Sequence, residues 1–265
     1  MKLKFYKYEG TGNDFVIIDN RNGKLKANNY KLWEKLCDRR FGIGADGLML
    51  LQNKKGYDFE MYYVNADGKP TSMCGNGGRC ITHFAKKMGV IKGNKAHFLA
   101  IDGDHEALIK GEVVKLKMKD VDEVKIKVEA KKEQFILNTG SPHYVTFAEN
   151  VMQSDIVEQG RAIRNSKDFK KEGINVNFVE LRKKDIPLLR TYERGVEDET
   201  LSCGTGTVAT ALVLAEKDKS TAKDHCDLQT MGGKLKVWFS KSKNGFKDVY
   251  LEGPVKMVYS GIIEI

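Results

Sequence analysis

Two cysteines of this chain occupy nearly the same local sequence, in a setting where a thiol can act as a base, an acid or a nucleophile. Cys74 begins the sequence Cys-Gly-Asn-Gly-Gly, and Cys203 begins Cys-Gly-Thr-Gly-Thr. A helical pattern follows each of them, over 81–88 and over 208–215. The start of a helix favours negative charge, so a thiol there ionises below its free pKa of about 8.5. The two cysteines therefore predict a pair of thiols that act on one small molecule from opposite sides.

The similarity extends from the cysteines to the whole chain. Gly12 precedes Cys74 by 62 residues, and Gly140 precedes Cys203 by 63. Both glycines follow a threonine and lead into apolar runs typical of β-strands. A period of about 128 residues is longer than the repeats of solenoid proteins and indicates a duplicated domain instead.

Composition limits the classes of protein and partner to be considered. The chain has 265 residues, enough for two domains with a core each, and its five cysteines are an odd number that argues against a disulfide framework. We therefore expect a reducing, cytoplasmic compartment. No apolar run approaches the ~20 residues of a membrane span, and the N-terminus lacks the apolar stretch of a signal peptide.

The net charge of +9 raises the question of a nucleic-acid partner. Lysines alternate with apolar residues over 114–119 and 124–128, as in half-buried strands, and no aromatic residues interleave with a basic stripe to stack bases. We expect neither a nucleic-acid nor a membrane partner.

Short strand-like runs separated by turn signals dominate the chain. Amphipathic helices are expected over 30–40 and near 151–161, and one more helix follows each of the two paired cysteines. The pattern predicts an α+β fold of two strand-rich domains, with one buried helix in each. The boundary between them is weakly marked, near 120–133.

The residues around the two thiols suit proton transfer at the α-carbon of an amino acid. The Gly-x-Gly after each cysteine lets the backbone approach a ligand, and two helix starts present amides to a carboxylate. One thiolate then removes the α-proton while the opposite thiol returns a proton to the other face, which is epimerisation or racemisation by two bases. The scheme requires no cofactor and no metal. An alternative of another class is a redox switch in which Cys74 and Cys203 form a disulfide. The remaining cysteines, Cys37, Cys80 and Cys226, are expected as small buried apolar residues.

Over nearly its whole length the chain resembles the diaminopimelate epimerase family. The motifs that carry the resemblance are Gly12-Asn13-Asp14-Phe15, Asn65-Ala66-Asp67-Gly68, Cys74-Gly75-Asn76-Gly77-Gly78-Arg79-Cys80, Pro142-His143, Tyr192-Glu193-Arg194-Gly195, and Glu199-Thr200 ahead of Cys203-Gly204-Thr205-Gly206. The resemblance implies two pseudo-symmetric domains, each a β-barrel-like sheet wrapped around a central helix. The last strand would return to the first domain, so that residues 1–120 plus 254–265 form one domain and residues 121–253 the other.

The same resemblance implies an activity and a set of site residues. The activity is the interconversion of L,L- and meso-diaminopimelate by a cofactor-independent, cytoplasmic homodimer, in lysine and peptidoglycan-precursor biosynthesis. The catalytic thiols fall on Cys74 and Cys203, and His143 and Glu193 adjust thiol protonation, His143 as an imidazolium that stabilises a thiolate. The implied substrate-binding residues are Asn13, Asn65, Gly75, Asn76, Asn175, Glu193, Arg194, Gly204 and Thr205. Arginine can grip a distal carboxylate through two donors.

Two positions depart from the pattern of the family. Many members carry glutamine where this chain has Gly47 and asparagine where it has Ser141. Both departures concern polar contacts to the substrate rather than the thiols. Proline racemase and hydroxyproline epimerase, which resemble the family in fold and thiol pair, are the nearest enzymatic alternatives. Arg194 and the asparagines favour a long substrate with a second carboxylate over a compact ring.

Overall fold

The computed structural model describes residues 1–71, 73–129, 132–183, 185–219 and 222–265. The chain forms two compact units, Met1–Leu116 with Gly253–Ile265 (unit 1) and Lys117–Glu252 (unit 2). Unit 2 begins four residues before the expected boundary at 120/121. The reason is local, because the Met118 N–H donates to the Val249 carbonyl at 2.8 Å and Val121 exchanges two backbone hydrogen bonds with Phe246.

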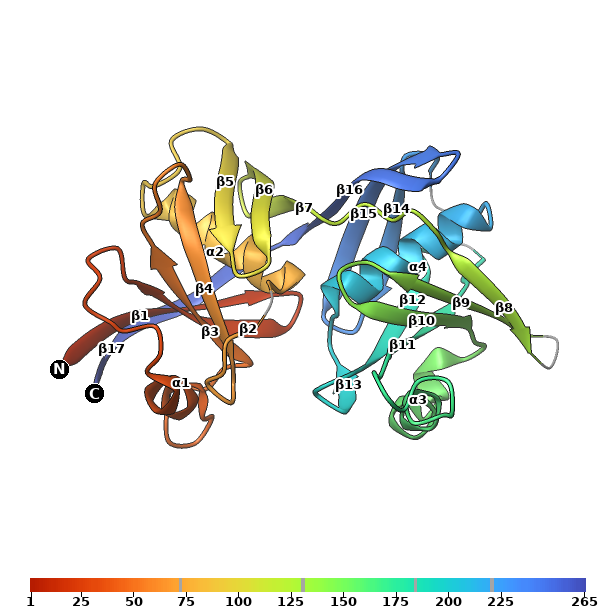
Figure 1. The fold of residues 1–265 in the computed structure, drawn as a ribbon, viewed down its shortest axis with the longest axis horizontal. Helices are drawn as coiled ribbons and strands as arrows, with labels where there is room; N and C mark the ends of the chain where they lie inside the picture. Colours follow the sequence, from red (N-terminus) through yellow and green to blue (C-terminus); the bar gives the residue numbers. More distant parts are fainter. Residues whose placement is uncertain (72, 130–131, 184, 220–221) are drawn as a thin grey trace. The chain divides into compact units, whose positions relative to one another are not determined.

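Unit 1 is strand-rich, and both chain ends lie in it. Its elements are β1 (Lys2–Gly10), β2 (Asn13–Asp19), α1 (Tyr30–Cys37), β3 (Gly47–Gln52), β4 (Phe59–Asn65), α2 (Gly75–Lys87), β5 (Lys95–Ala100), β6 (Gly103–Lys110), β7 (Val113–Lys117) and β17 (Lys256–Glu264). β17 pairs antiparallel with β1, and Figure 1 shows these two strands side by side. Hairpin pairing joins β1 to β2 through Thr11 and Gly12, both with positive φ.

The order of strands in unit 1 places β2 and β3 beside α2, the helix that follows Cys74. β2 runs parallel to β3 with Phe15 opposite Gly47, and β3 runs antiparallel to β4. α2 contacts β1, β2, β3, β4 and β6, so the strands surround it. The helix begins at Gly75 rather than near residue 81 as the pattern predicts. The glycines have low helix propensity, but the first turn is buried against the strands and packing decides its conformation.

Unit 2 repeats this plan. Its elements are β8 (Lys125–Glu129), β9 (Lys132–Asn138), β10 (Pro142–Phe147), the 3-10 turn η1 (Val151–Gln153), α3 (Ile156–Arg164), β11 (Asn175–Glu180), β12 (Leu188–Glu193), β13 (Asp198–Thr200), α4 (Gly204–Glu216), β14 (His225–Thr230), β15 (Gly233–Ser242) and β16 (Gly245–Pro254). β10 runs parallel to β11 with His143 opposite Asn175, and β11 runs antiparallel to β12. This is the register of β2, β3 and β4 in unit 1.

The helix after Cys203 is the centre of unit 2. α4 contacts β9, β10, β11, β12, β14 and β15, as Figure 1 shows for the strands around it. All its residues except Thr205 and Glu216 are buried. A helix that is apolar on every side is typical of a buried core position. The predicted α+β class and the two strand-rich repeats, each around a central helix, are therefore confirmed.

The smaller helices differ from their predicted limits for local reasons. α1 ends at Cys37, three residues before the predicted end at residue 40. The helix predicted near 151–161 is divided, because Asp155 lies in an extended conformation and its carboxylate accepts the Glu158 N–H at 2.8 Å. That contact caps a new helix start at Ile156. Within the ranges that the structure describes, no helix is long and apolar enough to cross a membrane.

Candidate active site

The thiol of unit 1 faces an amide oxygen. Cys74 is half-buried, has an extended backbone and directly precedes the first residue of α2. Its Sγ lies 3.4 Å from Oδ1 of Asn13, which also accepts from Nδ2 of Asn76 at 3.3 Å. The Asn13 amide is oriented from behind, since its Nδ2 donates to Asp46 at 2.7 Å. An amide oxygen accepts hydrogen bonds and cannot donate them, so this contact favours the protonated thiol of Cys74.

A network of charged residues holds Asn13 in place. Arg39 lies 2.8 Å from Asp14 and 2.7 Å from Asp46, and Nζ of Lys7 lies 2.6 Å from Asp14. Burial raises the pKa of Asp14, but hydrogen bonds from Arg39 and Lys7 outweigh it and lower that pKa to about 2. The carboxylate is therefore ionised at neutral pH, and the network is a fixed support for the amide that faces the thiol.

A buried arginine lies under the first turn of α2. Arg79 is fully buried and donates to the Gly75 carbonyl at 3.3 Å, to Oδ1 of Asn76 at 3.0 Å and to Oγ1 of Thr11 at 3.4 Å. Burial lowers its pKa, but a guanidinium stays charged in proteins. Unit 1 thus places a positive charge beneath the turn that begins at Cys74.

The thiol of unit 2 faces a hydroxyl. Cys203 is buried and directly precedes the first residue of α4, and its Sγ lies 3.5 Å from Oγ1 of Thr205. Nε2 of His143 lies 2.9 Å from the same hydroxyl. Oγ1 of Thr139 donates to the Thr205 carbonyl at 2.9 Å, which joins the Thr-Gly turn to the start of α4. Thr205 therefore connects the imidazole to the thiol.

His143 is neutral at physiological pH. Burial, and next the positive charge of Arg194, lower its pKa to about 3. The sequence-based interpretation of His143 as an imidazolium beside a thiolate is therefore wrong. The imidazole contacts the Thr205 hydroxyl, and that hydroxyl contacts Sγ of Cys203. Its role in tuning thiol protonation stays a prediction.

The polar residues near His143 are tied together on the strand ends of unit 2. Nδ2 of Asn175 donates to Oγ of Ser141 at 2.8 Å, and its Oδ1 accepts the Arg194 N–H at 2.8 Å. The guanidinium of Arg194 donates to the Glu172 carbonyl at 2.8 Å. Ser141, one of the two departures from the family pattern, thus supports Asn175.

The other predicted residues lie at the ends of their strands. Glu193 accepts from Thr200 at 2.9 Å, and the side chain of Asn65 is exposed at the end of β4. Asn65 is paired with Gly47, the second departure. A Cβ at Gly47 would lie 2.6 Å from the Tyr63 ring and 2.7 Å from the backbone oxygen of Val64. Gly47 therefore makes room for Tyr63, and a longer side chain there requires Tyr63 to move.

The structure brings most of the predicted residues together in two half-sites. Half-site 1 contains Cys74, Gly75, Asn76 and Asn13, and half-site 2 contains Cys203, Gly204, Thr205, His143, Asn175 and Arg194. Glu193 at the end of β12 accepts from Thr200, and Asn65 at the end of β4 is paired with Gly47. The three remaining cysteines are buried as predicted, and burial raises the pKa of Cys37 to about 12. Among the described residues, no cluster of His, Cys, Asp and Glu is arranged to hold a metal ion.

Residues that sequence reasoning missed support both half-sites. Asp46 orients Asn13 in unit 1, and Asn177 contacts His143 in unit 2 at 3.1 Å. Asn177 lies two residues after Asn175 on β11, so its side chain is on the same face of the strand. That spacing was the available signal for it.

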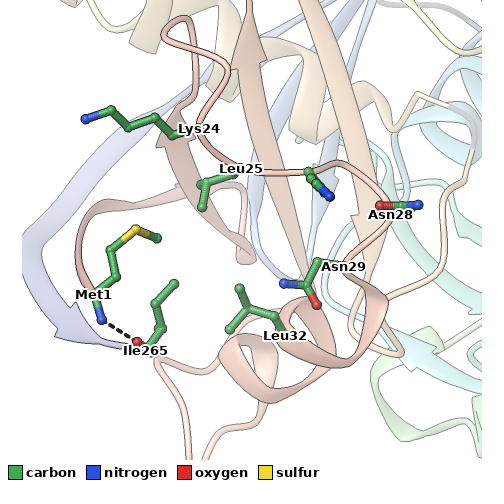
Figure 2. A pocket seen from close by; sticks show the side chains of 8 residues that line it. Met1, Lys24, Leu25, Asn28, Asn29, Leu32 and Ile265 are labelled. Atoms are coloured by element: carbon green, nitrogen blue, oxygen red, sulfur yellow. Dashed lines mark hydrogen bonds between the residues drawn. The ribbon is translucent and has the colours of Figure 1, made fainter.

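Unit 1 also has a pocket of about 460 Å³ at the chain ends. Its lining residues, shown in Figure 2, are Met1, Lys24, Leu25, Lys26, Asn28, Asn29, Leu32 and Ile265. The Met1 amino group donates to the Ile265 oxygen at 2.5 Å across it. Neither thiol lines this pocket, and it contains no side chain suited to take up a proton at neutral pH.

Comparisons with known proteins identify the family and the fold of this chain. A family model described as diaminopimelate epimerase matches residues 5–129 and again residues 135–258. The diaminopimelate epimerase of Flavobacterium psychrophilum is 48% identical over 262 residues, which are 98% of this chain and 100% of that protein. Among solved structures, a phenazine biosynthesis protein of the PhzF family from Bacillus anthracis has a TM-score of 0.79 at 13% identity, with 100% of both chains covered. A hydroxyproline epimerase from Agrobacterium vitis has a TM-score of 0.72 at 13% identity, covering 99% of this chain and 92% of that one. These two structures share the fold, and the sequence matches show that this chain belongs to the diaminopimelate epimerase family.

Proposed function

We propose that this chain interconverts L,L- and meso-diaminopimelate by proton transfer at one α-carbon, with Cys74 and Cys203 as its acid–base groups and no cofactor. One observation carries the proposal. Each repeat places a cysteine directly before the first residue of a buried helix, with a glycine next to it. A relative that is 48% identical over 98% of this chain carries the name of this activity.

The chemistry requires that the two thiols hold different protonation states. A thiolate takes the α-proton from one face, and the opposite thiol gives its proton to the other face, so the two sulfurs exchange states in each turnover. Amides at the helix starts, on Gly75, Asn76, Gly204 and Thr205, would bind the substrate carboxylate and stabilise the charge that develops on it. The reverse reaction uses the same groups with their roles exchanged.

The remaining predicted residues would complete the binding of the substrate, and Arg194 would recognise its far end. Asn13, Asn65, Asn175 and Glu193 offer amide and carboxylate groups, and Arg194 offers a guanidinium for the distal carboxylate. The backbone contacts of Arg194 and Asn175 hold this region in one conformation. We propose further that the enzyme is a cytoplasmic homodimer with this small molecule as its partner, acting in lysine and peptidoglycan-precursor biosynthesis. The odd number of cysteines in the sequence favours a reducing compartment.

Isotope exchange tests the proposal directly. The purified protein is incubated with L,L-diaminopimelate in deuterated water, and the α-carbon is followed by NMR and chiral chromatography. We expect deuterium at the inverted centre, and loss of inversion in Cys74→Ala and in Cys203→Ala. Cys226→Ala, at a buried cysteine of β14, is the matched control and should keep activity.

Three outcomes would contradict the proposal. Full inversion by either thiol variant would exclude the two-base scheme. Activity on proline or hydroxyproline, with none on diaminopimelate, would move the substrate to the ring-shaped alternative. Absence of exchange, together with reversible formation of a Cys74–Cys203 disulfide, would favour the redox switch.

A further inference from the structure

His143 and Asn177 of unit 2 occupy the positions that Phe15 and Met49 occupy in unit 1. The parallel pairs β2–β3 and β10–β11 place Phe15 opposite Gly47 and His143 opposite Asn175. Met49 and Asn177 each follow two residues later on the second strand. The glycine three residues after each of the two cysteines confirms the match. A Cβ at Gly77 would contact Met49 and Phe15, and a Cβ at Gly206 would contact Asn177.

The two pairs are equally buried but chemically different. Phe15, Met49, His143 and Asn177 all have 0% of their surface exposed. Burying polar groups costs free energy unless each group is hydrogen-bonded. The apolar pair of unit 1 shows that the fold can fill this position without polar atoms. The polar pair of unit 2 therefore has a purpose beyond packing.

The amide of Asn177 has a defined orientation. Its Nδ2 lies 3.0 Å from the backbone carbonyl of Tyr144, which can only accept, and its Oδ1 accepts from Oγ1 of Thr191 at 3.0 Å. The nitrogen end of the amide is therefore the end that faces Nδ1 of His143, at 3.1 Å. Since Nδ2 is a donor, Nδ1 of His143 must be the acceptor.

The tautomer of His143 follows from this contact. A neutral imidazole has one donor and one acceptor, so its proton is on Nε2, which donates to Oγ1 of Thr205 at 2.9 Å. Nδ2 of Asn175 lies 3.5 Å from the same Nε2, too far to compete with the shorter contact. Because Oγ1 accepts from His143, the Thr205 hydroxyl hydrogen is available to Sγ of Cys203 at 3.5 Å. Burial and the charge of Arg194 keep the imidazole neutral.

We propose that Asn177 is a positioning residue, which sets the His143 tautomer in which the Thr205 hydroxyl donates to Cys203. Cys203 then rests as the thiolate, while Cys74, which faces Oδ1 of Asn13, rests as the thiol. Close packing keeps Asn177 in place, since a Cβ at Gly206 would lie 2.4 Å from its Oδ1. The assignment of Cys203 as the resting base for catalysis rests on the proposed function. The tautomer of His143 and the hydrogen bond from Thr205 to Cys203 do not depend on the proposed function.

The first test reads the tautomer without any substitution in the relay. Nitrogen-15 NMR of the wild-type imidazoles identifies which nitrogen carries the proton, and His143→Gln assigns one signal among the five histidines. We expect a proton on Nε2 and none on Nδ1 from pH 5 to pH 9. A proton on Nδ1 of His143 in the wild-type protein would overturn the proposal.

The second test measures the effect on the thiol. The thiolate absorbance of Cys203 is titrated as the difference between each protein and its Cys203→Ser form. Asn177→Met introduces the unit 1 residue, and Thr205→Val removes the hydroxyl. We expect each to raise the pKa of Cys203 by about one pH unit, the scale of one hydrogen bond to a charged group. Thr205→Ser should restore the wild-type value.

The double variant separates a relay from a merely structural role. If Asn177 acts through Thr205, adding Asn177→Met to Thr205→Val raises the pKa of Cys203 no further. Two shifts that add, or an unchanged pKa in Thr205→Val, would overturn the proposal. Met49→Leu is the matched control and should leave this pKa unchanged. None of these measurements needs a substrate, so inactivity toward diaminopimelate would contradict the proposed function and leave the relay to be decided by NMR and titration.

Discussion

The turn at Cys74 and the turn at Cys203 have the same backbone plan and opposite surroundings. In both, a cysteine with an extended backbone precedes a buried helix that begins with glycine. The sulfur of Cys74 faces an amide oxygen, whereas the sulfur of Cys203 faces a hydroxyl held by a neutral imidazole. The comparison teaches that the repeated scaffold places each thiol directly before a buried helix, while the groups that face the two sulfurs differ in hydrogen-bonding chemistry.

The supporting networks differ in charge as well. Asn13 is held by a network of Lys7, Asp14, Arg39 and Asp46. His143 is held by the uncharged groups of its neighbours on β11 and α4. The charges of Lys7, Asp14, Arg39 and Asp46 are paired with one another, whereas the groups around His143 that hold it are neutral, and unpaired charge is costly to bury. Each difference between the half-sites gives a test, in order of expected effect.

Loss of either thiol should have the largest effect. Cys74→Ala and Cys203→Ala should each lower the epimerisation rate by about 10³-fold, since each removes one acid–base group. The remaining thiol should still exchange the α-proton on its own face. We expect faster exchange in Cys74→Ala, where the base that remains is the one facing a donor. Equal exchange of both stereoisomers by both variants, measured by NMR in deuterated water, would remove the distinction between the half-sites.

His143→Phe introduces the residue found at the equivalent position of unit 1, Phe15. This variant should change how the free energy of unfolding depends on pH. The pKa of His143 is lowered from 6.5 to about 3 in the native state, so below pH 6.5 the unfolded state binds a proton that the native state does not. The free energy of unfolding therefore falls as the pH falls from 6.5 toward 3. Between pH 6.5 and pH 4 the fall should be smaller in His143→Phe by about 3 kcal/mol.

Denaturant titrations at several pH values measure this slope. His97→Phe, at an exposed histidine of β5, is the control and should keep the wild-type slope. A wild-type slope in His143→Phe would mean that the native imidazole titrates normally, contrary to its complete burial.

The charged network of unit 1 should act at lower pH. The native pKa of Asp14 is lowered from 3.8 to about 2, so its contribution is present above pH 4 and is lost as the pH falls toward 2. That contribution is about 2 kcal/mol. Asp14→Asn should be less stable at pH 6, because buried Lys7 loses its carboxylate partner, and should lose less stability between pH 4 and pH 2. Glu106→Gln, at an exposed position of β6, is the control and should show the same pH dependence of the free energy of unfolding as the wild type. The same pH dependence in Asp14→Asn would show that the network does not contribute to stability.

Substitution of the glycine three residues after each cysteine, Gly77 or Gly206, should show the smallest and clearest contrast. A Cβ at Gly206 would lie 2.4 Å from Oδ1 of Asn177, whereas a Cβ at Gly77 would lie at 3.4 Å from Met49 and Phe15. Gly206→Ala should lower the free energy of unfolding by about 1–3 kcal/mol through overpacking. Gly77→Ala should change it by less than about 1 kcal/mol, since alanine favours the helix. Equal values in urea titrations would show that the two turns pack alike.

Sequence patterns predicted the duplication and the two helices, but not where the helices begin. Glycines at the starts of α2 and α4 have low helix propensity, so the apolar pattern placed the starts near 81 and 208. Burial of the first turn among the strands overrides that propensity. The thiols were found because their context is repeated, whereas Asn177 was missed because its unit 1 counterpart, Met49, gives no polar signal. The prediction that His143 is charged was wrong for a related reason, since the burial of this side chain cannot be read from a Pro-His pair.

The sequence by itself determined the pair of thiols, the repeated halves and the family, because these depend on residue types at fixed spacing along the chain. The tertiary structure decided what faces each sulfur. Asn13 and Cys74 are 61 residues apart, and His143 and Thr205 are 62 apart. Whether a thiol meets a donor or an acceptor depends on amide orientation, tautomer and burial. These are set by packing between distant segments, and the chemistry of a thiol in a low-dielectric site depends on them more than on its own sequence motif.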